Sequence, residues 1–501
     1  MKSDQNINRR KFLGSAGAAV AFTVVPRHVL GGPGYVAPSD KLNLGYIGLG
    51  TQGLRELTGL LPNPEIQVVA ACDPNADSQD YVDWSRNGLR NNIRKFLENP
   101  AWGEGDSGIR AGREVGKEII EAYYARNKPS GKYKGCAAYA DFRELLEKEK
   151  DLDAVKVMTP DHLHATIAIA AMKKGKHVVM HKPVSNVMYE VKLAVETTRS
   201  TKVATHLSAW SGGNSMQQIK GWIESGAIGS LREVHNWINK PIWPQWPSNP
   251  TDTPPVPQGL DWDLWLGPAL YRPYHPNYTH AVFRGWYDFG SGILGDMGYY
   301  SLWPVFMAFD LPAPLSVESN GSFTCEIKDH VSGVQENKVS FPIASTMRFK
   351  FPARGQMPPL ELYWYDGGMK PPTPAELEMD GKEIPESGML FVGDSGKILG
   401  DFLGNKPQII PGKKMLEFQG AKEPAERERG HRDEWVEAFK GGKPSEGNFE
   451  NARACAEMVC LGAVALRVGR KLEWDSENMQ ITNVPEANDL LRRQYRPGWE
   501  L

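Results

Sequence analysis

Apolar runs and helical patterns alternate in the first part of the chain. The apolar run at 44–47 predicts a strand, and the spaced leucines of 54–61 that follow predict a helix face. A second apolar run at 68–73 predicts the next strand. The alternation returns with a helix start at 142–146, a strand at 154–158, a helix at 163–174 and a strand at 177–180. This order is typical of a doubly wound parallel sheet of the Rossmann type.

The pattern changes twice along the chain. Two helical patterns, at 84–98 and 113–127, interrupt the alternation and indicate an insertion of about 80–135 in the first domain. Beyond residue 230 the chain is first rich in Pro and Trp, and strand-like segments then occur at 345–350 and 360–364. We therefore expect a second, α+β domain with a large, mostly antiparallel open sheet.

A chain of 501 residues exceeds what one hydrophobic core usually holds. We expect a signal peptide and linker at 1–40, a nucleotide-binding Rossmann domain at 41–205 and a substrate-binding domain at 206–430. The last segment, 431–501, has helical patterns at 431–439 and 452–468 and is expected to pack where the two domains meet.

Composition narrows the class of partner. The net charge of −2 offers no basic surface for nucleic acid or an anionic membrane, so a small molecule is the expected partner. The 15 Trp and 17 Tyr suit carbohydrate rings, although most of them are expected to fill the core. The five cysteines have neither the spacing of metal ligands nor that of a disulfide framework, and we expect no metal.

The N-terminus has the pattern of a twin-arginine export signal. Arg9 and Arg10 precede Phe12 and Leu13, and an apolar run at 16–25 follows that is too short to span a bilayer. The sequence thus predicts a periplasmic protein without a stable membrane anchor. Because a periplasm offers no free pool of NAD, such an enzyme should hold its cofactor tightly.

A glycine-rich turn follows the first predicted strand. Gly48 permits the tight turn, Gly50 lets the backbone approach a pyrophosphate, and Gly53 lets the next helix pack against the sheet. Asp73 closes the second strand and can accept a hydrogen bond from a ribose hydroxyl, which favours NAD over NADP. The expected cofactor-binding residues of this region are Gly48, Leu49, Gly50, Thr51, Gln52, Gly53 and Asp73.

Two further motifs end successive strands: T-P-D-H-L-H at 159–164, and G-K-H-V-V-M-H-K-P at 175–183. Together with the glycine turn they resemble the glucose-fructose oxidoreductase / inositol dehydrogenase (Gfo/Idh/MocA) family. The resemblance implies that Lys182 lies beside substrate and nicotinamide, and that His181 stands where the family usually has Glu. It adds to the cofactor-binding residues Thr159, Pro160, His164, His181 and Lys182.

The segment 284–300 resembles the family's glycine-rich stretch that ends in D-x-x-x-H. Asp296 matches the acid, but Tyr300 stands where the family has its acid/base His. Tyr300 could replace that His if a cation such as Lys182 lowers its pKa. Otherwise another histidine supplies the function, or the site no longer oxidises sugars. The expected catalytic residues are Lys182, Asp296 and Tyr300, the expected substrate residues are Arg284, Trp286 and Tyr287, and the alternative histidines are His206, His275 and His280.

The resemblance implies an exported NAD-dependent oxidoreductase acting on a secondary hydroxyl of a sugar, glycoside or cyclitol. Two alternatives remain open at this point. One is net glycoside cleavage through a 3-keto intermediate on tightly bound NAD, and the other is a non-catalytic sugar- or nucleotide-binding protein on the same fold. We also expect a homo-oligomer, because proteins of this kind commonly associate through their sheets.

Overall fold

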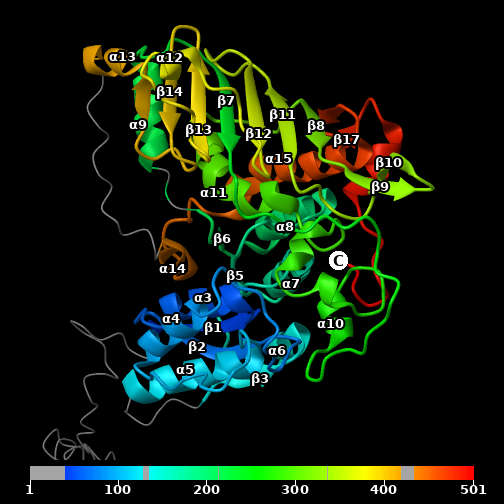
Figure 1. Cartoon of the computed structure of the whole chain (residues 1–501). Helices are drawn as coiled ribbons and strands as arrows, with labels where there is room; N and C mark the ends of the chain where they lie inside the picture. The colour runs from blue at the N-terminus through cyan, green and yellow to red at the C-terminus, as the bar shows by residue number, and fades with distance from the viewer. Residues whose placement is uncertain (1–39, 128–134, 211, 213, 336, 419–433) are drawn as a thin grey trace, which may run out of the picture.

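The computed structural model describes residues 40–127, 135–210, 212, 214–335, 337–418 and 434–501, and the predicted export signal lies outside these residues. Two sheets, one above the other in Figure 1, are separated by helices. The first has six parallel strands in the order β3-β2-β1-β4-β5-β6. They are β1 (Leu42–Ile47), β2 (Ile66–Cys72), β3 (Ala137–Tyr139), β4 (Ala154–Val157), β5 (His177–Met180) and β6 (Thr205–Leu207).

Helices bury both faces of this sheet, which is why β4 is buried at every position. The helices on one face are α3 (Thr51–Leu60), α4 (Gly88–Leu97), α5 (Arg113–Asn127) and α14 (Glu434–Phe439). The other face packs against α6 (Phe142–Lys148), α7 (Asp161–Lys173) and α8 (Met188–Thr201). The sequence patterns therefore predicted the parallel sheet and its flanking helices correctly.

The region expected as an insertion contains α4 and α5. Helix α5 packs on β2 and β3 and connects them, so it is a crossover helix of the sheet itself. The extra chain is therefore shorter than the predicted 80–135 and consists mainly of the segment between β2 and α5. Helical periodicity could not make this distinction, because a crossover helix and an inserted helix have the same pattern.

The second sheet has nine strands in the order β15-β14-β13-β7-β12-β11-β8-β16-β17, antiparallel except for β7 beside β12. Buried and half-exposed positions alternate along β11 and β12, because one face packs on helices and the other does not. Its strands are β7 (Leu231–Trp237), β8 (Ser316–Gly321), β11 (Ser345–Phe351), β12 (Leu360–Tyr365), β13 (Gly388–Gly393), β14 (Lys397–Gly400), β15 (Gln408–Ile410), β16 (Leu472–Asp475) and β17 (Gln480–Ile481).

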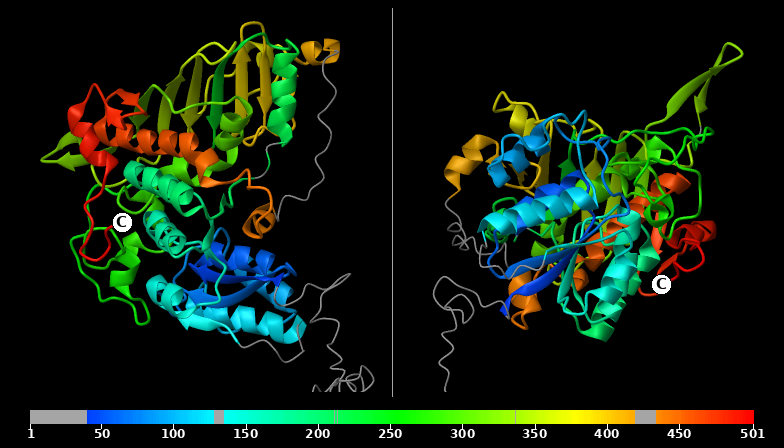
Figure 2. Two further views of the ribbon diagram at one scale, coloured as in Figure 1. Left: turned by 180° about the vertical axis from the view of Figure 1, so that it is seen from behind. Right: turned by 90° about the horizontal axis from the view of Figure 1, so that it is seen from below.

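Shorter elements complete the described chain. A separate hairpin, β9 (Thr324–Lys328) and β10 (Val331–Gln335), extends from the body in Figure 2. The remaining helices are α9 (Asn214–Glu224), α10 (Trp262–Leu266), α11 (Gly292–Ala308), α12 (Ala375–Glu378), α13 (Gly412–Glu417) and α15 (Phe449–Val468), with short 3-10 turns at Pro276–Tyr278, Val282–Gly285 and Pro485–Leu491. No helix within the described ranges is long and apolar enough to cross a membrane.

Helix α15 and the C-terminal tail join the two sheets. Helix α15 packs against α8, α11 and β8, and it lies between the two sheets in Figure 1. The C-terminal tail then returns to the first layer, where Arg493 forms a 2.7 Å ion pair with the fully buried Glu190 on α8. Helix α11 contacts the residues that follow β5, because Asp296 and Tyr300 on α11 pair with Lys182 and His181.

Candidate active site

The glycine turn has the geometry that its spacing predicts. Gly48 has a φ of +96°, and a Cβ there would lie 2.5 Å from the backbone of Met158. A Cβ on Gly53 would lie 2.2 Å from the carbonyl oxygen of Gly48, so only glycine lets α3 pack this closely. Gly50 is the N-cap of α3 and has no capping side chain, which leaves the first backbone N–H groups of the helix available for an anion.

A cavity of about 90 Å³ opens beside this turn, and we call it the glycine-loop cavity. Asp73 lines it, and its carboxylate accepts hydrogen bonds from the backbone N–H groups of Leu49 at 2.7 Å and Asn75 at 2.8 Å. Thr159 and Pro160 line it as predicted, and the buried Oγ1 of Thr159 has no hydrogen-bond partner among the described residues. Backbone N–H groups, a carboxylate and an unpartnered hydroxyl fit a dinucleotide.

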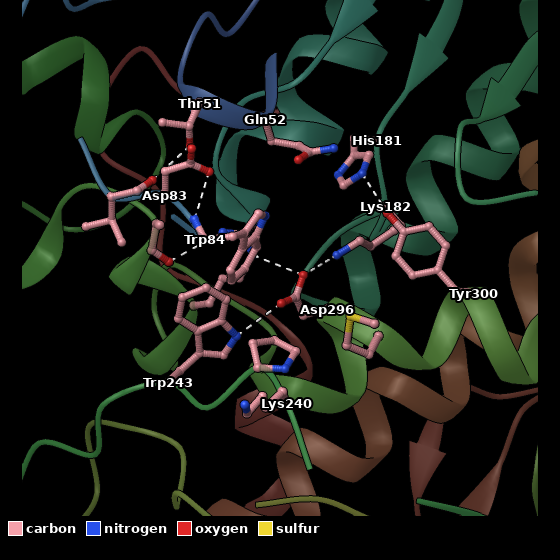
Figure 3. A pocket seen from close by; sticks show the side chains of 15 residues that line it. Thr51, Gln52, Asp83, Trp84, His181, Lys182, Lys240, Trp243, Asp296 and Tyr300 are labelled. Carbon is pink, nitrogen blue, oxygen red and sulfur yellow. Dashed lines mark hydrogen bonds and ion pairs between the residues drawn. The ribbon is translucent and has the colours of Figure 1, made fainter. Parts of the chain in front are cut away.

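A larger cavity of about 400 Å³, the lysine cavity, adjoins the first and shares Thr51, Gln52, Ala281 and Arg284 with it. Side chains from the glycine turn, the end of β5, α11 and the segments around residues 83, 241 and 282 meet there. Figure 3 shows these side chains around the cavity. Its other lining residues are Val82, Asp83, Trp84, His181, Lys182, Lys240, Pro241, Trp243, Asp296, Met297 and Tyr300.

Lys182 is the buried cation of this cavity, with 2% of its surface exposed. Its ammonium group donates to Asp296, which also accepts from the indole of Trp243 at 3.1 Å and lies 3.2 Å from the guanidinium of Arg284. Burial lowers the pKa of Lys182, although Asp296 opposes that effect. Burial acts to raise the pKa of Asp296, but Lys182 and Arg284 hold it at about 2. Asp296 is therefore a carboxylate that holds two cations in place.

His181 and Tyr300 form a second polar pair in the same cavity. The Nε2 atom of His181 lies 2.8 Å from the hydroxyl oxygen of Tyr300 and 3.5 Å from the carboxylate of Glu56. Burial lowers the pKa of His181 to about 3, against the effect of Glu56, so the ring is neutral near pH 7. Glu56 in turn forms a 2.6 Å ion pair with Lys156 on β4.

The condition set for Tyr300 as the acid/base, a pKa lowered by a cation such as Lys182, is not met. Burial raises that pKa far above its usual value, and the negative charges of Asp296 and Glu56 raise it further. The ammonium of Lys182 lies 5.3 Å from the centre of the tyrosine ring, near its face and not beside its hydroxyl. Tyr300 is therefore protonated at neutral pH, and any role in proton transfer depends on its partner His181.

Four of the expected residues line neither cavity: Leu49, His164, Trp286 and Tyr287. Leu49 is fully buried, and its backbone N–H donates to Asp73. Trp286 is fully buried, donates to the carbonyl of Asn277 and stacks on Trp246, while Tyr287 packs on Phe341. These two aromatic residues belong to the core and do not bind substrate here. His164 is buried between the carbonyl oxygens of Thr159 and Pro183, and its ring nitrogens lie 2.9 and 2.6 Å from them. It therefore connects the backbones of the two motifs.

The alternative histidines have different positions. His206 is buried against Ser445 at 2.7 Å, and His275 caps a short 3-10 helix. His280 lines the glycine-loop cavity, where it stacks on Tyr81 at 3.6 Å between ring centres. None of the three lines the lysine cavity, whereas His181 does.

Sequence reasoning missed Trp84, Trp243 and Glu56. Trp84 and Trp243 come from irregular segments in which no motif marks a ligand contact, and Glu56 lies on α3 among the polar positions of a helical pattern. A charged residue on the central strand β4, Lys156, was the available signal for a buried partner such as Glu56. Within the described residues, no group of three His, Cys, Asp or Glu side chains is arranged to hold a metal ion, and the five cysteines form no disulfide.

Curated relatives match parts of the chain. Levoglucosan dehydrogenase from Pseudarthrobacter phenanthrenivorans is 33% identical over 94 residues, which are 18% of this chain and 24% of that protein. A glycosyl hydrolase family 109 protein from Shewanella baltica is 24% identical over 243 residues, 45% of this chain and 44% of that protein. The matched segments therefore span less than half of either relative.

Solved structures share the fold. The WlbA dehydrogenase from Bordetella pertussis, in complex with NADH and UDP-GlcNAcA, has a TM-score of 0.52 and 14% identity, covering 87% of this chain and 99% of that chain. An NAD-binding protein from Listeria innocua has a TM-score of 0.50 and 14% identity, with 87% and 99% covered. At these identities the likeness shows the fold alone.

Family models match most of the described chain. The oxidoreductase family's NAD-binding Rossmann fold matches residues 109–208, and its C-terminal alpha/beta domain matches 213–336 and 363–501. The match at 109–208 covers β3 to β6 of the parallel sheet, whereas β1, the glycine turn and β2 precede it. The match of the C-terminal domain covers most strands of the nine-stranded mixed sheet. The chain thus belongs to the Gfo/Idh/MocA oxidoreductase family, with an NAD-binding Rossmann domain and the family's C-terminal alpha/beta domain.

Proposed function

We propose that this protein oxidises a secondary hydroxyl group of a sugar, glycoside or cyclitol with NAD as the oxidant. The observation that carries the proposal is the position of Lys182. Its buried ammonium group lies in a cavity beside the glycine-loop cavity, with the His181–Tyr300 pair in the same wall. Open α/β sheets bind their ligands at this edge, beyond the carboxyl ends of the strands.

Five charged or polar side chains have a role in this proposal. Bound NAD would supply the hydride acceptor. Lys182, held by Asp296, donates a hydrogen bond to the substrate oxygen and stabilises the negative charge that develops there. The hydroxyl proton of the substrate passes to the oxygen of Tyr300 while the proton of Tyr300 passes to Nε2 of His181. The nearby carboxylate of Glu56 stabilises the imidazolium that results.

Asp73 supports a preference for NAD over NADP. It lines the glycine-loop cavity, and burial raises its pKa while the N–H groups of Leu49 and Asn75 act in the opposite direction. A carboxylate at this position accepts a hydrogen bond from a ribose hydroxyl and repels a 2′-phosphate. Comparing the affinities of the two nucleotides tests this preference.

Redox-neutral glycoside cleavage is the second candidate. The similarity to glycosyl hydrolase family 109 proteins favours it. Oxidation at C3 would acidify the neighbouring C–H bond, elimination would expel the aglycone, and water would add to the resulting double bond. The hydride removed in the first step would return in the last, so the cycle would need no external oxidant.

Export through the twin-arginine route fits such a cycle. The motif at Arg9 and Arg10 lies outside the described residues, so the support comes from the sequence alone. Folded proteins use this route, and cofactor bound before export would remain with the enzyme. Cell fractionation of the full chain and of an Arg9→Lys, Arg10→Lys variant tests the proposed periplasmic location.

The activity is tested by mixing the purified protein and NAD with a panel of sugars, glycosides and inositols. A rise in absorbance at about 340 nm would show reduction of the nicotinamide and identify the substrate class. Product analysis of the same mixtures detects a released aglycone, which marks the redox-neutral cycle. Nucleotide binding with neither change across the panel would favour a binding protein.

A further inference from the structure

Trp84 is exposed at the lysine cavity. Its surface is 67% accessible, and it is the one exposed tryptophan of the 15 in the chain, all of which the structure describes. Most large apolar side chains are buried, and an exposed one that lines a cavity is typical of a ligand surface. Trp84 comes from the extra chain between β2 and α4, which the parallel sheet itself does not require.

Three contacts hold the two residues that directly precede Trp84. The hydroxyl of Thr51 donates to the carbonyl of Val82 at 3.0 Å, which ties the segment to the start of α3. The buried carboxylate of Asp83 pairs with Arg55 on α3 and accepts from the backbone N–H of Leu89 at the start of α4 at 3.1 Å. The exposed ring is therefore presented from a fixed segment of chain.

A second indole continues this surface into the cavity. The ring of Trp243 lies 6.0 Å from that of Trp84 at an angle of 52°, and its N–H donates to Asp296, the partner of Lys182. Lys240 lies near Trp243 in Figure 3, and Pro241 lines the same cavity. We call the set of Val82, Trp84, Lys240, Pro241 and Trp243 the outer subsite, because it adjoins the charged group around Lys182.

We propose that the outer subsite binds a second ring, joined by a glycosidic bond to the ring whose hydroxyl lies at Lys182. This inference rests on the proposed function and narrows its substrate class to glycosides. The cavity of about 400 Å³ is within the size range of small-molecule sites, and the indole faces match the apolar face of a sugar or aryl ring. The ammonium of Lys240 can donate to hydroxyl groups at the edge of that ring.

Calorimetric binding to the NAD-loaded protein tests the proposal. The probes are a monosaccharide, the corresponding aryl glycoside and a disaccharide that contains the same sugar, which distinguish an aromatic second ring from a sugar. We expect at least one of the two-ring ligands to bind about 3- to 10-fold more tightly than the monosaccharide, as one stacked ring allows. Trp84→Ala should remove this difference, and Trp84→Phe should retain part of it. In Trp84→Ala the affinity for the two-ring ligand should fall more than the affinity for the monosaccharide.

Tyr271→Ala is the matched control, because Tyr271 is equally exposed at 69% and does not line the cavity. Thermal unfolding of each variant confirms that it folds. Equal affinities for one-ring and two-ring ligands, or an equal loss for both in Trp84→Ala, would overturn the outer subsite and leave the proposed function standing. Absence of binding for every carbohydrate, with NAD bound, would overturn both.

Discussion

The imidazole of His181 forms a 2.8 Å hydrogen bond with the hydroxyl group of Tyr300. The two residues are 119 positions apart, His181 directly after β5 and Tyr300 on α11. In the sequence they are the two departures from the motifs of the family, His for Glu and Tyr for His. Their contact joins the residue that follows β5 to helix α11 in the wall of the lysine cavity.

Removing the hydroxyl of Tyr300 should therefore impair turnover. We expect Tyr300→Phe to lower kcat by about 10²- to 10⁴-fold, the usual contribution of a positioned acid/base, with the affinity for NAD unchanged. His181→Asn should have a similar effect, and the double variant should be little worse than either one because the two residues act as a unit.

Tyr299→Phe is the matched control for this experiment, because Tyr299 is on the same helix but fully buried and outside the cavity. Steady-state kinetics with a substrate from the panel provide the comparison. Full activity in Tyr300→Phe would remove the tyrosine from the proton pathway.

Asp296 should matter for stability as well as for activity. In Asp296→Asn, Lys182 and Arg284 lose the carboxylate that both contact. Breaking a buried ion pair from one side typically costs about 3–5 kcal/mol of unfolding free energy. Urea denaturation measures this loss, and Lys182→Met in the Asp296→Asn background should recover part of it while the protein stays inactive. If the Asp296→Asn variant were as stable as the parent, the carboxylate of Asp296 would not stabilise Lys182 and Arg284 as described.

Substitutions of two glycines of the turn should affect different properties, Gly53→Ala the stability of the fold and Gly50→Ala the binding of NAD. A Cβ on Gly53 lies 2.2 Å from the Gly48 carbonyl, so Gly53→Ala should destabilise the fold by about 1–3 kcal/mol. The nearest contact of a Cβ on Gly50 is 3.1 Å, to the ring of Tyr81, so Gly50→Ala should fold and bind NAD more weakly.

Gly59→Ala, on the same helix with nothing within 4 Å of the added Cβ, is the control. It should leave NAD affinity unchanged and stabilise the helix by up to about 1 kcal/mol. Thermal unfolding and nucleotide titration measure both properties, and undiminished NAD affinity in Gly50→Ala would argue against the assigned role of the turn.

Because buried histidines resist protonation, the free energy of unfolding should decrease as the pH falls. Burial lowers the pKa of His206 to about 3, below the value of about 6.5 for an exposed histidine. The unfolded state therefore binds a proton that the folded state does not, and stability is lost as the pH falls below about 6.5. In this window His206 contributes about 1.4 kcal/mol for each pH unit.

His206→Asn keeps an amide beside Ser445, the partner of the His206 ring, and removes this titration. Urea unfolding of the parent and the variant between about pH 6 and pH 4 should show a smaller pH slope for the variant. Identical slopes would mean that His206 is protonated in the folded protein.

The sequence predicted the parts of the site that local patterns encode. The glycine turn, Thr159, Pro160 and Lys182 follow buried strands of a parallel sheet, and the carboxyl ends of such strands lie at one edge. The structure brings all of these residues to the two cavities, together with Asp296 and Tyr300 from α11.

Features that depend on tertiary contacts could not be predicted in this way. Trp286 and Tyr287 follow Arg284 closely in the chain, yet the backbone directs their side chains into the core while Arg284 reaches the cavity. The pKa of Tyr300 depends on burial and on Asp296 and Glu56, and no motif reports those distances. Likewise, Trp84 lies in irregular chain, and its exposure becomes evident only when the fold is known.

Transfer of a label from substrate to nucleotide tests the central claim most directly. A substrate found in the panel is prepared with deuterium on the carbon that carries the reacting hydroxyl, mixed with the NAD-loaded protein and quenched within one turnover. Mass spectrometry of the released nucleotide should show one deuterium in the reduced nicotinamide, for net oxidation and for the redox-neutral cycle alike. Conversion of the substrate with no deuterium in the nucleotide would contradict the account.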